Sequence, residues 1–174
     1  LAYPAKTVVI TGGEPLMWNM QPLTDSLHNK GMSVHIETSG AYPLSGDFDW
    51  ICLSPKKNNP PKEAIIPKAN ELKVIIHNRN DFKWAEQFAS QCSSNCKLYL
   101  QPEWSKAKEM MQEIVDYVMN NPKWNISLQS HKYRSENWVV VKGIAKVTLD
   151  KQVKELKVGE SIFIPKQAIH RLEN

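Results

Sequence analysis

The sequence lacks the features that mark membrane, secreted or nucleic-acid-binding proteins. No apolar run approaches the roughly 18 residues that a membrane-spanning helix needs, and no signal-type segment opens the chain. We therefore expect a cytoplasmic protein without a membrane partner. The net charge of +4 comes from scattered lysines, not from one basic block. That distribution weakly favours an anionic ligand and predicts no nucleic-acid partner.

Cysteine is also scarce. Only Cys52, Cys92 and Cys96 occur in 174 residues, and an odd number of cysteines in a cytosolic chain argues against a disulfide framework. The spacing of Cys92 and Cys96 suggests a metal site, but no third or fourth cysteine stands near them. Cys52 lies within an apolar segment, so we interpret it as a small core residue.

Short apolar segments then alternate with helical patterns over about three-quarters of the chain, which is typical of βαβ units and a parallel sheet. Strands are expected at 8–10, 33–36, 50–53, 72–76, 97–100 and 124–129, and helices at 18–30, from about 81, and from a cap at Ser105. After Tyr133 only strands are expected, at 137–142, 145–149 and 161–164. The sequence thus predicts an α/β domain at 1–130 and a partial all-β domain at 131–174.

Polar residues follow the expected strands. The segments are TGGEP at 11–15, ETSG at 37–40, SPK at 54–56, QPE at 101–103 and QSHK at 129–132. Ligands of parallel α/β folds bind at the carboxyl ends of the strands, so these segments predict one shared ligand cleft. Gly12 and Gly13 would let a ligand approach main-chain N–H groups. Glu14 is suited to a ligand ammonium group or to paired hydroxyls.

In this order, the five segments resemble those of the radical S-adenosylmethionine enzyme 7-carboxy-7-deazaguanine synthase, over about residues 5–133. The resemblance implies a partial radical-SAM (β/α) barrel, S-adenosylmethionine as cofactor and a small-molecule substrate. The family makes 7-carboxy-7-deazaguanine from 6-carboxytetrahydropterin in queuosine precursor biosynthesis. Whether the protein forms a homodimer stays open. The resemblance assigns cofactor binding to Gly12, Gly13, Glu14, Glu37, Ser54, Lys56 and Gln101, and substrate binding to Thr11 and His131.

The full-length family also uses a [4Fe–4S] cluster and Mg, and it holds the cluster on a CxxxCxxC loop before the GGE strand. The sequence contains no such loop. Cys92 and Cys96 come too late in the order and lack a third partner, and a cluster needs suitably spaced thiolates. We therefore interpret the chain as the later part of such an enzyme, inactive alone. Whether it is itself an enzyme stays open, and its catalytic residues are unknown.

The segment at about 126–174 resembles a different family, the C-terminal cupin of type II mannose-6-phosphate isomerases, which are often fused to mannose-1-phosphate guanylyltransferase. That resemblance implies a metal site of Gln129, His131, Glu136 and His170 for zinc or another divalent ion. The alternative function is accordingly a metal-dependent isomerase or guanylyltransferase cupin. A third hypothesis is a non-catalytic protein whose cupin binds a sugar nucleotide or stabilises a partner.

The octapeptide at 126–133 fits both families. One short stretch would have to end a radical-enzyme barrel and also begin a cupin. The sequence therefore suggests a join between two unrelated genes at a short identical stretch, either natural or artefactual.

Overall fold

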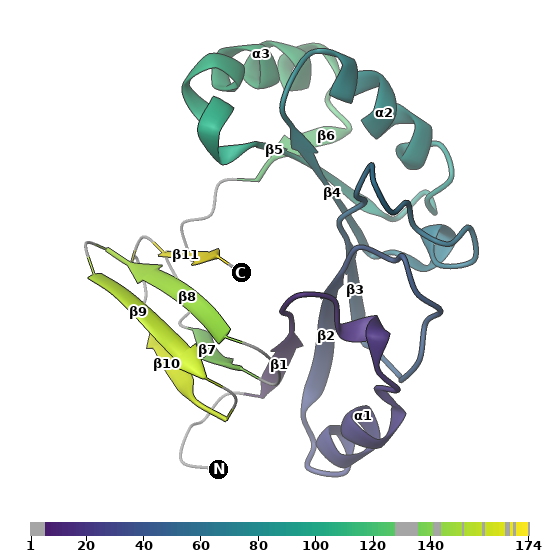
Figure 1. Ribbon diagram of the computed structural model, residues 1–174. Helices are drawn as coiled ribbons and strands as arrows, with labels where there is room; N and C mark the ends of the chain where they lie inside the picture. The colour runs from purple at the N-terminus through teal and green to yellow at the C-terminus, as the bar shows by residue number, and fades with distance from the viewer. Residues whose placement is uncertain are drawn as a thin grey trace. The chain divides into compact units, whose positions relative to one another are not determined.

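Six parallel strands form the sheet of the larger of two units, as a computed structural model shows (Figure 1). The structure describes residues 6–127, 136–140, 144–150, 152–157, 159–165, 168 and 170–173. The chain divides into a unit of residues 1–127 and a unit of residues 128–174. Among the described residues, no helix has the length and apolar character that crossing a membrane requires.

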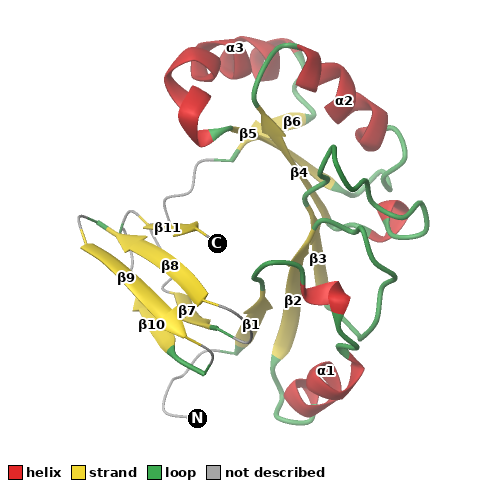
Figure 2. Cartoon of the chain, viewed as in Figure 1, coloured by secondary structure: helices red, strands yellow, loops and turns green. Residues whose placement is uncertain are grey.

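The strands of the larger unit lie in the sheet in the same order as in the sequence. They are β1 (Thr7–Ile10), β2 (Ser33–Thr38), β3 (Trp50–Leu53), β4 (Glu71–Ile76), β5 (Lys97–Pro102) and β6 (Trp124–Ile126). The helices are α1 (Gln21–His28), α2 (Asn80–Ala89) and α3 (Ala107–Asn120). Right-handed crossovers that always step in one direction place all helices on the same face of the sheet. The predicted α/β class is confirmed (Figure 2).

The two faces of this sheet differ in chemistry. The face that packs against the helices is apolar, and Ile36, Leu53 and Leu72 on it are 0% exposed. The opposite face, which we name the polar face, carries Glu37, Cys52, Glu71, Lys73, Tyr99 and Gln101 in adjacent registers. A parallel sheet covered on both faces has continuous apolar strands. The alternation here shows that helices cover one face only.

Helix α2 packs on β4, and α3 packs on β5 and β6. Glu86 of α2 joins these layers, because its carboxylate accepts hydrogen bonds from Tyr117 Oη at 2.7 Å, Trp124 Nε1 at 2.7 Å and Lys123 Nζ at 2.6 Å. Burial and then the Glu86 carboxylate raise the pKa of Tyr117 to about 12. The helical face of the sheet is therefore held by the hydrogen bonds of the half-buried Glu86 as well as by apolar packing.

Two helix starts differ from the sequence-based expectation. Pro22 fits only in the first turn of a helix, so α1 begins at Gln21 and not at Trp18, and a short 3-10 helix occupies Pro15–Met17. The expected cap at Ser105 is also wrong. The Glu103 carboxylate accepts a hydrogen bond from Ser105 N at 2.9 Å and caps a 3-10 helix at Trp104–Lys106. Helix α3 begins directly after it.

The smaller unit is antiparallel, which confirms its all-β class. Strand β7 (Glu136–Val139) pairs with β10 (Ser161–Ile164). Strand β8 (Ile144–Leu149) pairs with β9 (Gln152–Lys157) on one side and β11 (His170–Glu173) on the other. Its described core consists of Val140, Ala145, Val147, Leu156, Ile162, Ile164 and Ala168. Strands β9 and β11 are additions to the predicted set.

Candidate functional site

The glycine turn after β1 leaves the main chain open to solvent. Gly12 has a φ of 139°, which favours glycine, and a Cβ at this position would meet no atom within 4 Å. Gly13 is exposed as well, and Thr11, which precedes the turn, is half-buried. A ligand can therefore reach the backbone at the end of β1 without displacing a side chain.

Glu14 ties the end of β1 to the end of β2. Its Oε1 atom accepts hydrogen bonds from Leu16 N at 3.1 Å and Thr38 Oγ1 at 2.5 Å. Its Oε2 atom accepts from Ser39 N at 2.8 Å and from Ser39 Oγ. Both carboxylate oxygens are thus engaged within the protein, and the contact of Glu14 with a ligand stays a prediction.

Glu37 forms an ion pair with Lys73 on the polar face, with 3.0 Å between Oε2 and Nζ. Lys73 is only 7% exposed. Burial acts to lower the pKa of Lys73, but the Glu37 carboxylate acts against burial, and the net shift is upward. The Lys73 ammonium group therefore stays charged at neutral pH.

Cys52 lies on β3 between these two partners. Its side chain is buried, as expected, but it belongs to the polar face and its Sγ donates to Glu71 Oε1 at 3.5 Å. Burial raises the pKa of the Cys52 thiol far above its ordinary value. The thiol is therefore protonated at neutral pH and contributes no charge beside Lys73.

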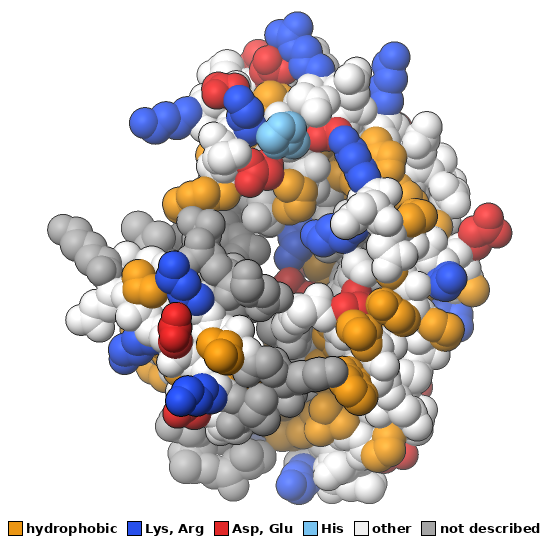
Figure 3. All heavy atoms as spheres, viewed as in Figure 1, with side chains coloured by type: hydrophobic (Ala, Val, Ile, Leu, Met, Phe, Trp, Pro, Cys, Tyr) orange, Lys and Arg blue, Asp and Glu red, His pale blue; other side chains and the backbone are white. Residues whose placement is uncertain are grey.

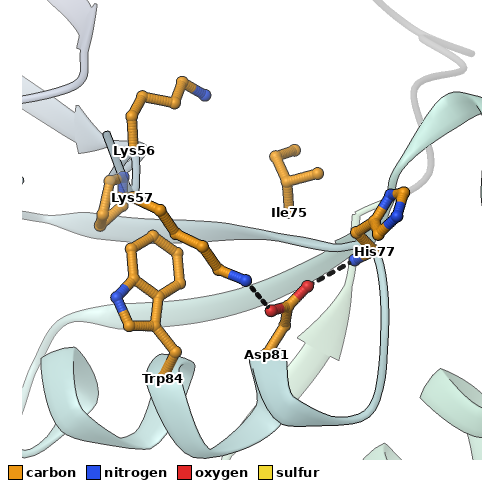
Figure 4. A pocket seen from close by; sticks show the side chains of 7 residues that line it. Lys56, Lys57, Ile75, His77, Asp81 and Trp84 are labelled. Atoms are coloured by element: carbon orange, nitrogen blue, oxygen red, sulfur yellow. Dashed lines mark hydrogen bonds and ion pairs between the residues drawn. The ribbon is translucent and has the colours of Figure 1, made fainter. Parts of the chain in front are cut away.

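A cavity of about 340 Å³ lies at the carboxyl ends of β3 and β4 (Figure 4). Its lining is Pro55, Lys56, Lys57, Ile75, His77, Asp81 and Trp84. Lys57 reaches over the Trp84 ring at 5.8 Å and pairs with Asp81, whereas Lys56 extends away from that pair. The cavity thus combines one fixed cation, one further ammonium group and an aromatic wall.

Lys56 Nζ donates to Ser54 Oγ at 3.2 Å, which brings together two predicted cofactor residues. Exclusion of water by surrounding protein lowers the pKa of Lys56, and the positive charge of Lys73 lowers it further. A lower pKa means that the charged form of Lys56 is less stable in this setting, so an anionic ligand group beside it would stabilise that form.

Gln101 ends the polar face on β5 and carries a buried acceptor. Its Oε1 atom has no hydrogen-bond partner within the described ranges of the chain. A buried carbonyl oxygen without a donor costs free energy. The position therefore fits a ligand that supplies an N–H or O–H group.

The predicted metal site is only partly described. Gln129 and His131 lie outside the described residues, and so does the side chain of Glu136. His170 has its Nδ1 atom 3.0 Å from the carbonyl oxygen of Ala168, and its ring meets Trp138 edge-on at 5.2 Å. Among residues that the structure does describe, no three His, Cys, Asp or Glu side chains converge as metal ligands.

Sequence reasoning missed Lys73 and Glu71 as polar-face residues. The available signal was the alternation in Glu71-Leu72-Lys73-Val74, where charged residues interrupt a buried strand at every second position.

Charged side chains of both signs are also present on the rest of the surface. Figure 3 shows Lys and Arg side chains spread over the visible surface, with acidic side chains between them.

The larger unit is therefore a parallel α/β unit of the (β/α)-barrel type, with helices on one face and the polar face on the other. Over 129 residues the chain is 59% identical to a 7-carboxy-7-deazaguanine synthase of Flavobacterium psychrophilum, which covers 74% of this chain and 61% of that protein. A 7-carboxy-7-deazaguanine synthase of Prochlorococcus marinus is 36% identical, with coverage of 74% and 67%. The chain belongs to the 7-carboxy-7-deazaguanine synthase family.

A solved structure agrees with this assignment. The chain superposes on QueE from Escherichia coli with a TM-score of 0.66 at 29% identity, covering 74% of this chain and 59% of that one. The chain thus spans about three-fifths of the length of the first two relatives it matches, at 61% and 60%. Separately, residues 100–174 match a family described as "Mannose-6-phosphate isomerase C-terminal".

Proposed function

We propose that the larger unit binds S-adenosylmethionine at the carboxyl ends of its strands, as part of an enzyme that makes 7-carboxy-7-deazaguanine from 6-carboxytetrahydropterin. The observation that carries the proposal is the 59% identity over 129 residues to a relative named for this product. The glycine turn supports it because it leaves room for a ligand, and Gln101 supports it because its buried Oε1 atom has no donor among the described residues.

Each predicted cofactor residue has a role that its chemistry supports. The open backbone of Gly12 and Gly13 receives the methionine end of the cofactor, and Glu14 holds that turn in place through Thr38 and Ser39. The remaining residues, Glu37, Ser54, Lys56 and Gln101, supply acceptors and donors for the amino group, the ribose hydroxyls and the base. When bound, S-adenosylmethionine supplies the radical chemistry, and the protein supplies position and electrostatics.

The three cysteines do not fit a [4Fe–4S] cluster. Cys52 is on β3, whereas Cys92 and Cys96 follow α2, and no group of three metal ligands occurs among the described side chains. Cluster binding needs convergent thiolates. The proposed binding of S-adenosylmethionine therefore rests on the residues at the strand ends alone.

The substrate contacts proposed with this function are Thr11 and His131, of which His131 lies outside the described residues. Thr11 stands half-buried between β1 and the glycine turn, a place from which its hydroxyl can reach a ligand at the strand ends. A homodimer is part of the same proposal, and sedimentation equilibrium measures it directly.

A second function is favoured by one observation, the match of residues 100–174 to the mannose-6-phosphate isomerase C-terminal family. Under it, Gln129, His131, Glu136 and His170 would bind zinc or a similar divalent ion. The antiparallel sheets of the smaller unit agree with a cupin segment. Calorimetric titration with zinc, with a His170→Ala variant as comparison, tests this alternative.

Calorimetry with S-adenosylmethionine on the purified chain tests the principal proposal. We expect saturable binding that Lys56→Met weakens about tenfold, as loss of a charged hydrogen-bond donor implies. Lys62→Met is the matched control, because it removes the same charge from an exposed loop position. Absence of binding to the unaltered chain, or an equal loss in both variants, would contradict the proposal.

A further inference from the structure

Lys73 occupies a position where lysine is rare. It lies in the middle of β4, its side chain is 9% exposed, and its neighbours Leu72 and Val74 are fully buried against the helices. Lysines are almost never this buried unless they are paired. The residue therefore has a partner that makes its position tolerable, and that partner is Glu37.

The ion pair spans a whole strand. Glu37 stands on β2 and Lys73 on β4, and Cys52 of β3 lies between them in register with Glu37. The small side chain of Cys52 leaves room for the lysine to reach across to the carboxylate at 3.0 Å. A larger residue at this register would fill the path, so Cys52 matters here for its size and its neutrality.

The pair is asymmetric in exposure. The lysine side chain is 9% exposed and the glutamate side chain 37% exposed, so the cation lies beneath and the carboxylate reaches the open side of the polar face. Lys73 bonds to Oε2, and in the described part of the chain no donor bonds to Oε1 of Glu37. Glu14, by contrast, has both oxygens engaged. Glu37 is thus a carboxylate of the polar face whose second oxygen has no hydrogen-bond donor among the described residues.

We propose that Lys73 is a positioning residue: through its ion pair it holds the Glu37 carboxylate so that Oε1 accepts a hydrogen bond from a hydroxyl or ammonium group of the bound ligand. This inference rests on the proposed binding of S-adenosylmethionine. Lys73 itself does not contact the ligand. Its removal affects affinity only while Glu37 is present.

A double-mutant cycle measured by calorimetry with S-adenosylmethionine tests this role. We expect Lys73→Met and Glu37→Gln each to raise Kd about tenfold, and the double variant to be no weaker than Glu37→Gln, because residues that act as a unit are non-additive. Lys73→Arg should restore affinity to within about threefold, since arginine keeps the ion pair. Lys97→Met is the matched control, because it removes a lysine that lies over Trp50 at the opposite end of the strands.

Three outcomes overturn the inference. Wild-type affinity in Lys73→Met shows that the lysine does not position Glu37, and losses that add in the double variant show that the two residues act separately. Absence of binding to the unaltered chain overturns the proposed function and this inference together, so the two failures are distinguishable. If Lys73→Met does not fold, because an unpaired Glu37 is left behind, the double variant with both charges removed takes its place. A double variant weaker than Glu37→Gln then refutes the positioning role.

Discussion

Glu14 and Glu37 differ in how much of each carboxylate the protein itself uses. Glu14 accepts hydrogen bonds from Leu16, Thr38 and Ser39, so its effect on a ligand passes through the backbone and hydroxyl groups that it fixes. Among the described residues Glu37 has one partner, Lys73, which bonds to Oε2 and leaves Oε1 without a donor. Substitution of Glu14 should therefore disturb the groups that it fixes at the strand ends, whereas substitution of Glu37 should act on the ligand contact itself.

We expect Glu14→Ala to weaken S-adenosylmethionine binding by about 1.5–3 kcal/mol, the usual scale for hydrogen bonds to a charged group. The same substitution should lower the free energy of unfolding, because four N–H and O–H donors, on Leu16, Thr38 and Ser39, lose their acceptor. Calorimetry and urea denaturation measure the two effects. Glu63→Ala, an exposed carboxylate, is the control. Unchanged affinity would remove Glu14 from the site in either role.

Asp81 predicts a pH dependence of stability. Burial acts to raise its pKa, but hydrogen bonds from Lys57, His77 N at 2.7 Å and Asn78 N at 3.1 Å lower it below 3.8 overall. Because the pKa of Asp81 is lower in the folded protein than its unfolded value of 3.8, the ionised carboxylate stabilises the fold above that value. This stabilisation is lost as the pH falls through the pKa of the folded protein. Asp81→Asn should therefore cost about 1.5–3 kcal/mol at neutral pH.

Urea denaturation of the two proteins between about pH 7 and pH 3 checks this expectation. The stability difference between the unaltered chain and Asp81→Asn should shrink as the pH falls. Asp47→Asn, at an exposed position, should follow the unaltered chain at every pH. A difference that stays constant through acid pH would show that the Asp81 carboxylate is not the source.

At the scale of elements, the connection after β2 depends on a glycine. Gly40 has a φ of 73°, and a Cβ on it would lie 2.6 Å from Leu53 Cδ1 and 2.9 Å from Pro61 Cβ. Gly40→Ala should therefore destabilise the larger unit by about 2–4 kcal/mol, from backbone strain together with overpacking.

Gly31→Ala separates these two causes. Gly31 has a φ of 70°, and a Cβ there would meet nothing within 4 Å, so only the backbone strain remains. We expect a loss of about 1–2 kcal/mol for it in thermal or urea unfolding. Equal losses at Gly31 and Gly40 would mean that the neighbours of Gly40 move aside at little cost.

Much of the parallel sheet could be predicted from the sequence, because β2, β4 and β5 carry buried β-branched or leucine residues at every second position. Strand β3 was predicted with its observed bounds, Trp50–Leu53. Helix starts were harder, since the apolar pattern reports neither the ring and missing N–H of Pro22 nor the hydrogen bond that Glu103 accepts from Ser105. The polar residues at the strand ends were visible as motifs. The pairing of Lys73 with Glu37 was not, because it depends on the register of three strands.

At the scale of the whole molecule, the two units differ in the size of the core that holds them. The apolar core of the larger unit runs from Leu16 to Trp124, while the described core of the smaller unit has seven residues. Small cores bury less of the chain's surface and give marginal stability. The unpaired edges of its short sheets also expose N–H and C=O groups.

We accordingly expect residues 134–174 to be the less stable part, with any metal bound weakly. Amide hydrogen exchange, with and without excess zinc, measures this. Protection in β8 and β10 should fall below that in β4 at both conditions. Protection equal to that of β4 would contradict the expectation, and protection that appears only with zinc would favour the cupin metal site instead.

The alternation along β4 also restricts changes in length. One residue inserted ahead of Leu72 would turn Leu72 and Val74 onto the polar face and drive the Lys73 ammonium group against α2, because side chains of a strand alternate with a period of two. Two inserted residues would restore the faces but carry Lys73 one register past Glu37. An in-frame insertion of a single codon in this strand is therefore more damaging than most substitutions there. The connection between β3 and β4, at 54–70, can absorb the same codon without exchanging the two faces.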